Sequence, residues 1–185
     1  MNEYRIPAGP GESELTEKRS RFLGHVRMVE SEDEARDFIA EMKKKYYDAR
    51  HHGGCYAVKD GPERYSDDGE PQGSAGIPML EVLRRRELTN AVCVVTRYFG
   101  GVLLGTGGLL RAYTQSTADA LDAAGVAVVR AWAEAEARCS YARAERMKTE
   151  AAALGAVTAD VVYGADVTLK LLIPAEQTEA VRARA

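Results

Sequence analysis

The sequence predicts an α+β protein with two units, residues 1–130 and residues 131–185. The β-branched run at 92–96 is typical of a strand buried on both faces, and a helical pattern follows at 107–124. From residue 131 onward, the hydrophobic spacing predicts strands and helices in the order β-α-β-β-α. A chain of 185 residues that is 45% hydrophobic is long enough for one or two modest domains.

The first elements are a strand and a helix. Residues 20–29 favour a strand, although their alternation is imperfect. Ser31 and Glu34 then form a capping-box pattern, and apolar residues such as Phe38 and Met42 recur at helical spacing behind them. We therefore expect an amphipathic helix that begins at Ser31.

The middle of the first unit alternates between regular and turn-rich segments. Residues 55–61 indicate a short strand, and 62–76 hold many turn-forming residues. A helix is predicted over 75–86 and a strand within 88–99. The helix at 107–124 is expected to stop at Gly125.

The second unit is expected to be ferredoxin-like. Its predicted elements are a strand from 132, a helix over 141–154, a strand pair at 156–164 and 165–174, and a helix from 175. The ferredoxin-like arrangement has one further strand. The 185 residues do not supply it, so we expect either that the chain is shortened or that the small domain does without this strand and exposes an unpaired sheet edge.

Composition excludes several classes of function. The 25 basic and 28 acidic residues give a net charge of −3, so no general field attracts nucleic acid or an anionic membrane. No long apolar run and no signal-peptide pattern occur, and we expect a cytoplasmic protein with no membrane partner. The three cysteines lack the spacing of a zinc site or a disulfide framework. We expect no metal, no cofactor and no readout of DNA sequence.

The glycine-rich stretch after the buried strand is the first candidate site. Glycines permit positive φ and close backbone approach, so several N–H groups can face one anion, and two guanidinium groups suit phosphate oxygens. The spacing matches neither a Walker loop nor a dinucleotide-binding fingerprint. An alternative of equal standing is that the arginines pair with nearby acids. The predicted binding residues are Arg97, Tyr98, Gly100, Gly101, Gly105, Gly107, Gly108 and Arg111.

The second candidate is the sequence SDDGEP, which favours a turn. Three carboxylates within four residues could also hold a hard cation or serve a hydrolase together with a histidine, with or without a divalent cation. A serine–histidine–aspartate trio or a Cys55–His52 pair can be formulated, but neither has a recognisable nucleophile motif. Tyr98 is a candidate for stacking on bases. The residues added by this second candidate are Ser66, Asp67, Asp68, Glu70 and His52.

Three stretches together carry a family resemblance: HHGGCYAV, SDDGEPQGSAGIPML and LTNAVCVVTRYFGGVLLGTGGLLRAY. They closely resemble the YigZ/IMPACT family, over roughly residues 15–125. The resemblance implies a two-layer α/β IMPACT N-terminal-like domain with a left-handed crossover, similar to domain IV of elongation factor G. It also implies a ferredoxin-like second domain similar to domain V of that factor. Such a crossover is an exception to the usual hand.

The family resemblance also carries functional expectations. Eukaryotic relatives act in translational control through protein partners, and the likeness to a translation factor suggests RNA or the ribosome as a partner. We therefore expect a non-enzymatic, translation-associated protein that contacts RNA phosphate through Arg97, Arg111 and the glycines. The alternatives are a hydrolase that uses His52 and the SDDGEP carboxylates, and a protein-interaction module in translational control.

Overall fold

The computed structural model describes residues 3–183 and divides the chain into two compact units. One unit comprises residues 4–129, and the other comprises residues from 130 onward together with Glu3. Each unit has its own buried apolar core. None of the helices in the described part is both long and apolar enough to cross a membrane.

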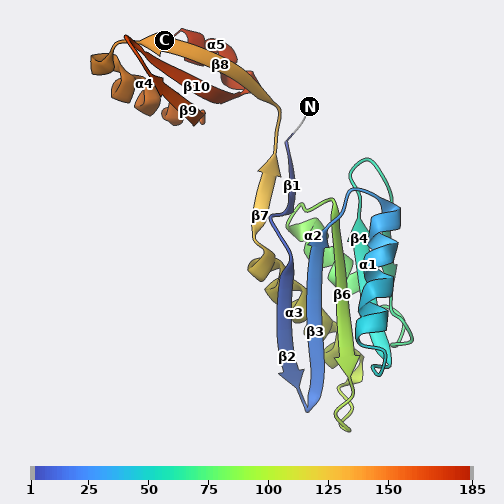
Figure 1. Cartoon of the computed structure of the whole chain (residues 1–185). Coiled ribbons are helices and arrows are strands. Elements are labelled where there is room, and N and C mark those ends of the chain that lie inside the picture. The colour runs from blue at the N-terminus through green and yellow to red at the C-terminus, as the bar shows by residue number, and fades with distance from the viewer. Residues whose placement is uncertain (1–2, 184–185) are drawn as a thin grey trace. The chain divides into compact units, whose positions relative to one another are not determined.

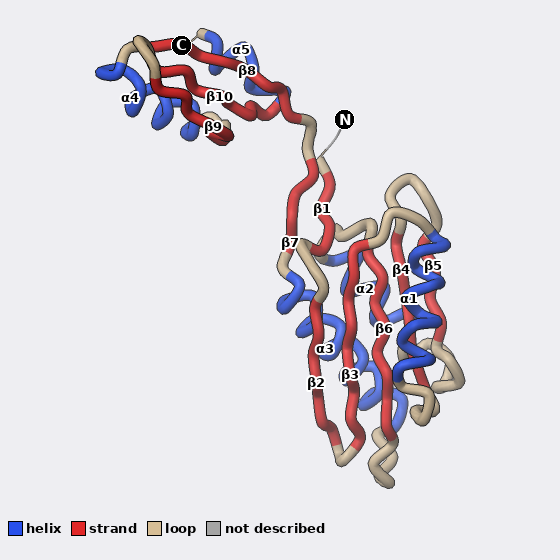
Figure 2. The backbone as a smooth tube through the Cα atoms, in the orientation of Figure 1, coloured by secondary structure: helices blue, strands red, loops and turns tan. Residues whose placement is uncertain are grey.

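The first unit is built on a five-stranded antiparallel sheet (Figures 1 and 2). Its strands, in spatial order, are β2 (Gly11–Glu17), β3 (Ser20–Met28), β6 (Ala91–Tyr98), β4 (His51–Ala57) and β5 (Glu63–Ser66). The short strands β1 (Tyr4–Pro7) and β7 (Val126–Val129) form a separate antiparallel pair.

Helices cover both faces of this sheet. Helix α1 (Glu32–Lys45) packs on the face that carries Val92 and Val94. Helices α2 (Gly76–Arg85) and α3 (Gly105–Ala124) pack on the face that carries Cys93 and Val95. The expectation of two layers is therefore wrong, and the unit has three, because β6 is apolar on both of its faces.

One crossover in the first unit has the unusual hand. In Figure 1, β3 runs upward, α1 lies in front of the sheet and β4 lies to the right of β3, which makes the first crossover right-handed. The second crossover runs from β5 through α2 to β6. Compared with the first crossover, its strands run in the opposite direction, its helix covers the other face of the sheet, and it moves the opposite way along the sheet. Three reversals invert the hand, so β5–α2–β6 is left-handed.

The second unit has the order β-α-β-β-α. Its sheet places β10 (Val167–Pro174) between β8 (Trp132–Cys139) and β9 (Val157–Tyr163), and both neighbours are antiparallel to β10. One face of the sheet is covered by α4 (Tyr141–Ala153) and α5 (Thr178–Arg182), which follows the short 3-10 turn η1 (Ala175–Gln177). This is the ferredoxin-like arrangement without its fourth strand, within residues 130–183.

Candidate functional site

Arg97 lies near the end of β6 and is buried. Its side chain is 7% exposed, and Nη1 donates to the two carboxylate oxygens of Glu70 at 2.8 and 3.0 Å. The hydroxyl of Tyr113, on α3, donates to Oε1 of the same carboxylate at 2.9 Å. Burial, and then the negative charge of Glu70, raise the pKa of the Tyr113 hydroxyl above its ordinary value. These three residues form a closed ionic network inside the unit.

This geometry does not match the expectation that Arg97 presents its guanidinium to an outside anion. Side chains alternate along a strand, so Arg97 points to the same face as Val95 and Cys93, where α3 supplies Tyr113. The equal alternative, in which the arginine pairs with an acid of the SDDGEP segment, describes Arg97 correctly. The network ties that segment to the strand that leads into the glycines.

Asp67 holds the start of α2. Its Oδ1 accepts hydrogen bonds from the backbone N–H groups of Ala75 and Gly76 at 3.0 and 2.9 Å. Its Oδ2 accepts from the N–H of Gly73 at 2.8 Å. Both carboxylate oxygens are therefore engaged with backbone donors at a helix N-terminus, where a negative charge is favourable.

Asp68 connects the same loop to β4 and α1. Its Oδ2 accepts from the backbone N–H of His52 at 2.8 Å, and Oδ1 forms an ion pair with Nζ of Lys43 at 2.6 Å. Burial acts to raise the pKa of the Asp68 carboxyl, but the hydrogen bonds from Lys43 and from the His52 amide outweigh burial and lower it. His51 Nδ1 lies 3.0 Å from the Asp68 carbonyl oxygen.

The proposed hydrolase residues do not assemble as a nucleophile and a base. Ser66 Oγ accepts from the backbone N–H of Asp68, while His52 Nε2 lies 3.1 Å from the carbonyl oxygen of Tyr46. Cys55 is fully buried, and burial raises the pKa of its thiol, which disfavours the reactive thiolate. Among residues 3–183, no group of three or more histidine, cysteine, aspartate or glutamate side chains could hold a metal ion.

The glycine loop, residues 99–104, lies against the turn between β2 and β3. A Cβ on Gly100 would lie 2.0 Å from the carbonyl carbon of Arg19, so only glycine permits this contact. The turn carries two exposed cations, Lys18 and Arg19, both at positive φ. Tyr98 donates to Asp48, and this hydrogen bond raises the pKa of Tyr98 to about 12.

The start of α3 and Arg111 lie beside this loop. Gly105, at φ +73, opens the helix, and no side chain in the described part caps its first N–H groups. Arg111, six residues after Gly105 on the same helix, is exposed and lines a groove of about 410 Å³ with Leu15 and Glu17 from β2. The Arg111 Nη1 atom is 3.7 Å from where a Cβ on Gly107 would lie. Gly108 also lines the groove.

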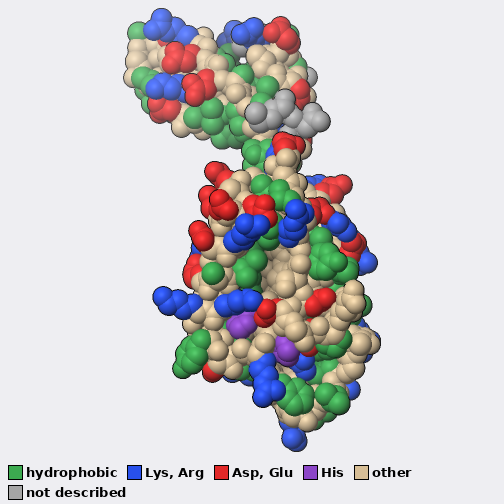
Figure 3. Space-filling view, turned by 90° about the vertical axis from the view of Figure 1, so that its right-hand side faces the viewer, with side chains coloured by type: hydrophobic (Ala, Val, Ile, Leu, Met, Phe, Trp, Pro, Cys, Tyr) green, Lys and Arg blue, Asp and Glu red, His purple; other side chains and the backbone are tan. Residues whose placement is uncertain are grey.

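The predicted residues therefore separate into two groups. Arg111 and the glycines are at the surface, whereas Arg97, His52 and Glu70 are buried. Sequence reasoning missed Lys18 and Arg19 as neighbours of the glycines. The sequence carried no clear signal for this turn, because the segment before it, Gly11–Glu17, lacks the hydrophobic alternation of a strand. On the face shown in Figure 3, basic and acidic side chains are interspersed around the histidines, so it carries no field of a single sign.

Comparisons with known proteins identify both parts of the chain. Residues 18–121 match the model of the Impact N-terminal domain, and residues 138–185 match that of a domain of unknown function (DUF1949). The chain is similar to IMPACT family member YvyE of Bacillus subtilis, at 44% identity over 128 residues, 68% of this chain and 59% of that relative. It is also similar to IMPACT family member YigZ of Escherichia coli, at 40% identity over 119 residues, 61% of this chain and 57% of that relative.

A solved structure supports the two-domain comparison. A crystal structure described as that of a hypothetical protein covers 100% of this chain and 91% of its own, with a TM-score of 0.67 and 30% sequence identity. These two curated relatives are matched over less than two thirds of their own length, and the solved chain over most of its length. Because the Impact N-terminal model covers more than half of its residues, the chain belongs to the IMPACT family.

Proposed function

We propose that this chain is a non-enzymatic, translation-associated protein of the cytoplasm that contacts RNA or ribosomal phosphate. The contact is made by the glycine-loop surface, defined as Lys18, Arg19, Gly100, Gly101, Gly105, Gly107, Gly108 and Arg111. Family membership supports the link to translation, since eukaryotic members act in translational control. The net charge of −3 requires that any such contact be local.

The observation that carries the proposal is that backbone N–H donors and cationic side chains are exposed together at one end of the first unit. Lys18, Arg19 and Arg111 are exposed, and within residues 3–183 none of them takes part in an ion pair. The first turn of α3 contains no acidic residue and has glycine at three of its first four positions. Backbone N–H groups at a helix start bind anions, and guanidinium groups grip phosphate in a bidentate manner.

Apolar side chains on the same loop add a second kind of contact. Phe99 is 52% exposed and Leu103 is 82% exposed. Exposed aromatic rings stack on unpaired bases without regard to sequence. This combination suits single-stranded RNA, in which bases and phosphates are both accessible.

The buried ionic network has a positioning role in this proposal. Arg97 ties β6 to Glu70, and its Nη2 atom lies 3.5 Å from Oγ of Ser20. The same Ser20 hydroxyl accepts from the backbone N–H of Gly100 at 3.2 Å. The network therefore holds the base of the glycine loop and leaves the loop's outer surface free for a ligand.

Binding to a fluorescently labelled single-stranded RNA, measured by anisotropy over a series of salt concentrations, tests the proposal. Replacement of Lys18, Arg19 and Arg111 by alanine should weaken binding and reduce the salt dependence by about one unit of slope for each lost phosphate contact. The control is Arg85→Ala. Arg85 is exposed and lies in the last turn of α2, before β6, and it is not part of the glycine-loop surface. If the triple variant keeps the affinity and salt slope of the unmodified chain, the proposal is wrong.

The hydrolase alternative has little support in this geometry. Asp67 is bound to backbone N–H groups, Asp68 to Lys43 and His52, and Glu70 to Arg97 and Tyr113. All three carboxylates therefore have structural partners, and their presence needs no catalytic explanation.

A further inference from the structure

We propose that the groove between β2 and α3 binds a guanine base of single-stranded RNA and that Glu17 recognises this base. The Glu17 carboxylate accepts hydrogen bonds from the N1–H and N2–H groups of the guanine. This inference rests on the proposed function, because it names the base that accompanies the phosphate contact. The groove has a volume of about 410 Å³, and its lining includes Leu15 and Glu17 of β2 and Gly108, Leu110 and Arg111 of α3.

One face of β2 is directed towards α3. Side chains alternate along a strand, so Ser13, Leu15 and Glu17 share a face. The Ser13 hydroxyl donates to the carbonyl oxygen of Ser116 at 2.7 Å, which places this face against the helix. Further along the strand, Leu15 and Glu17 face the start of α3, where Gly108 has no side chain. The groove opens at this point.

The groove has the size and the lining of a site for a nucleobase. Small-molecule sites have volumes of about 300–1,000 Å³ and mostly apolar walls with a few polar groups. Leu15, Leu110 and Ala112 supply apolar surface here, and Leu110 is 45% exposed. Apolar side chains contact the flat faces of unstacked bases, while polar groups recognise the base edges. A base in this groove would therefore be held by its faces and recognised along one edge.

Glu17 is the polar group of the groove that has no partner within the protein. The Thr114 hydroxyl donates to the carbonyl oxygen of Leu110 at 2.8 Å, and Gln115 Nε2 donates to Asp119 at 2.7 Å. Among residues 3–183, the Glu17 carboxylate takes part in no ion pair and no hydrogen bond. Both of its oxygens are therefore free to accept hydrogen bonds from a ligand.

The position of Glu17 is unexpected for a surface that binds phosphate alone. Glu17 directly precedes Lys18 and Arg19 and lines the groove with Arg111, yet within the described residues it pairs with none of them. A carboxylate repels phosphate, so it weakens the attraction of these cations for an RNA backbone. Phosphate contacts position a nucleic acid, whereas hydrogen bonds to base edges specify its sequence. An acid at this place is accounted for if it recognises a base.

Guanine is the base that best fits a single carboxylate. It has two neighbouring donors, N1–H and the N2 amino group, and the two oxygens of a carboxylate can accept one hydrogen bond from each. Adenine and cytosine each have one amino group next to an acceptor nitrogen, and uracil has one N–H between two carbonyl groups. In these three bases, an acceptor would lie against the second carboxylate oxygen. The carboxylate therefore favours guanine over the other bases.

Arg111 keeps its phosphate contact in this arrangement. Its Nη1 atom lies 3.7 Å from the place of a Cβ on Gly107, so the guanidinium is turned towards the start of α3. The phosphate contact is proposed at that helix start, and Glu17 remains for the base. A phosphate and a base of the same RNA would thus be bound next to each other.

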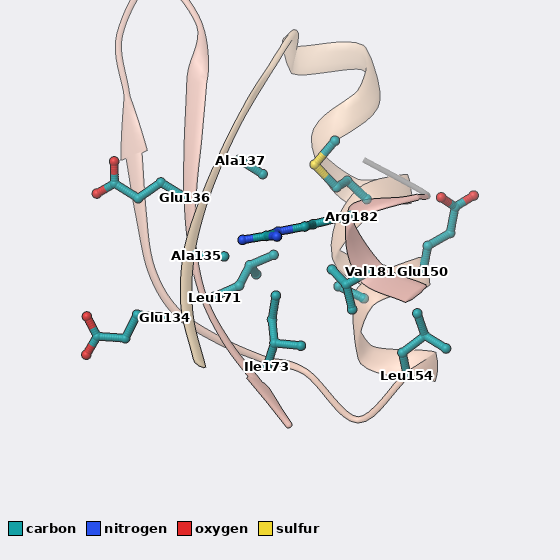
Figure 4. Close-up of a pocket in the computed structure, with 12 residues that line it drawn as sticks. Glu134, Ala135, Glu136, Ala137, Glu150, Leu154, Leu171, Ile173, Val181 and Arg182 are labelled. Atoms are coloured by element: carbon teal, nitrogen blue, oxygen red, sulfur yellow. The ribbon is translucent and has the colours of Figure 1, made fainter. Parts of the chain in front are cut away.

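The cavity of the second unit has a different lining. It has a volume of about 250 Å³ and lies between the sheet and the helices of that unit (Figure 4). Leu171 lines it with apolar surface, and Arg182 lies across it. The carboxylates of Glu134, Glu136 and Glu150 point away from it in Figure 4. Of these two hollows, the groove between β2 and α3 is the one that combines apolar walls with an acceptor for a base.

The test is an anisotropy titration of the 185-residue chain with labelled eight-nucleotide RNAs that differ at one position. Each is an oligouridine with guanosine, inosine, adenosine or cytidine at that position, and the all-uridine RNA is the reference. We expect the guanosine RNA to bind about tenfold more tightly than the adenosine, cytidine and uridine RNAs, as is typical of one bidentate base contact. Inosine has N1–H but no N2 amino group, so its RNA should bind with intermediate affinity.

Glu17→Gln makes the test specific. An amide has one acceptor oxygen in place of two, so this variant should lose most of the preference for guanosine. It should keep or increase its affinity for the all-uridine RNA, because a negative charge is removed. Glu12→Gln is the matched control, since Glu12 is an exposed acid of the same strand that lies on the opposite face. This control should keep the preference.

The possible outcomes separate this inference from the proposed function. If all five RNAs bind equally and the alanine variant of Lys18, Arg19 and Arg111 weakens their binding, the groove does not recognise guanine, although the phosphate contact stands. A preference for guanosine that persists in Glu17→Gln would also overturn the inference. If none of the RNAs binds, both the inference and the proposed function are wrong.

Discussion

Arg97 and Glu70 are charged residues that form an ion pair in the interior of the first unit. The Arg97 guanidinium lies 5.6 Å from the ring centres of both Phe22 and Phe99, and its Nε has no hydrogen-bond partner in the described part of the chain. A buried ion pair adds little stability compared with well-packed apolar residues, because both charges lose their hydration. Loss of a single partner is much more costly.

At this scale, we predict that Arg97→Met lowers the free energy of unfolding by about 3–5 kcal/mol, because Glu70 is left buried without its countercharge. The double variant Arg97→Met with Glu70→Gln should recover part of this loss, since a neutral amide can still accept from the Tyr113 hydroxyl. Urea unfolding of both variants measures the coupling. Additive losses would mean that the two residues do not form the unit described above.

Not every site residue could be interpreted from its neighbours in the sequence. Arg97 and Arg111 look alike in the sequence, since both flank the glycines. Only the facing residue decides their roles: Arg97 meets Glu70, whereas Arg111 lines an open groove. The sequence identified the glycine region as special, but it did not distinguish a structural cation from an exposed one.

At the scale of elements, the strongly patterned segments were predicted well. The strand at 20–29 is β3, and Ser31 is the N-cap of α1, where its hydroxyl accepts from the Glu34 N–H. Strands β1, β2, β5 and β7 were not predicted. Six of the seven residues of β2 are polar or glycine, and all four residues of β5 are exposed, so neither strand shows the hydrophobic alternation of a half-buried strand.

The packing of β2 on α3 gives a prediction at this scale. A Cβ on Gly11 would lie 2.0 Å from the carbonyl oxygen of Ala120, a backbone atom that cannot move aside cheaply. Gly11→Ala should therefore destabilise the first unit by an amount at the upper end of the roughly 1–3 kcal/mol typical of overpacking. Gly9→Ala is the matched control, because nothing lies within 4 Å of its added carbon. Its thermal unfolding should differ little from that of the unmodified chain, and equal effects of both changes would contradict this account.

At the scale of the whole molecule, the two units have separate cores. The buried cluster around Val167, Leu169 and Leu171 involves only residues of the second unit. The clusters on the two faces of the large sheet involve only the first. Unfolding of one unit therefore leaves the core contacts of the other in place.

Leu169→Ala provides the test of this independence. Leu169 is fully buried in the second unit, and its truncation should cost that unit about 2–5 kcal/mol. Trp132 fluorescence, which reports on the second unit alone, should shift to lower denaturant concentration. The part of the far-ultraviolet circular dichroism change that belongs to the first unit should keep its midpoint. A joint shift of both signals would show that the units unfold together.

The sequence by itself determined the α+β class, most helices and the buried strands, and the family, because these depend on local spacing and on motifs that are contiguous in the chain. The tertiary structure alone decided that helices cover both faces of the large sheet and that Arg97 is buried with Glu70. The physical reason is that these features depend on pairs of residues far apart in the chain. A residue's burial and charge partner are set by what packs against it, which its own neighbours in sequence do not specify.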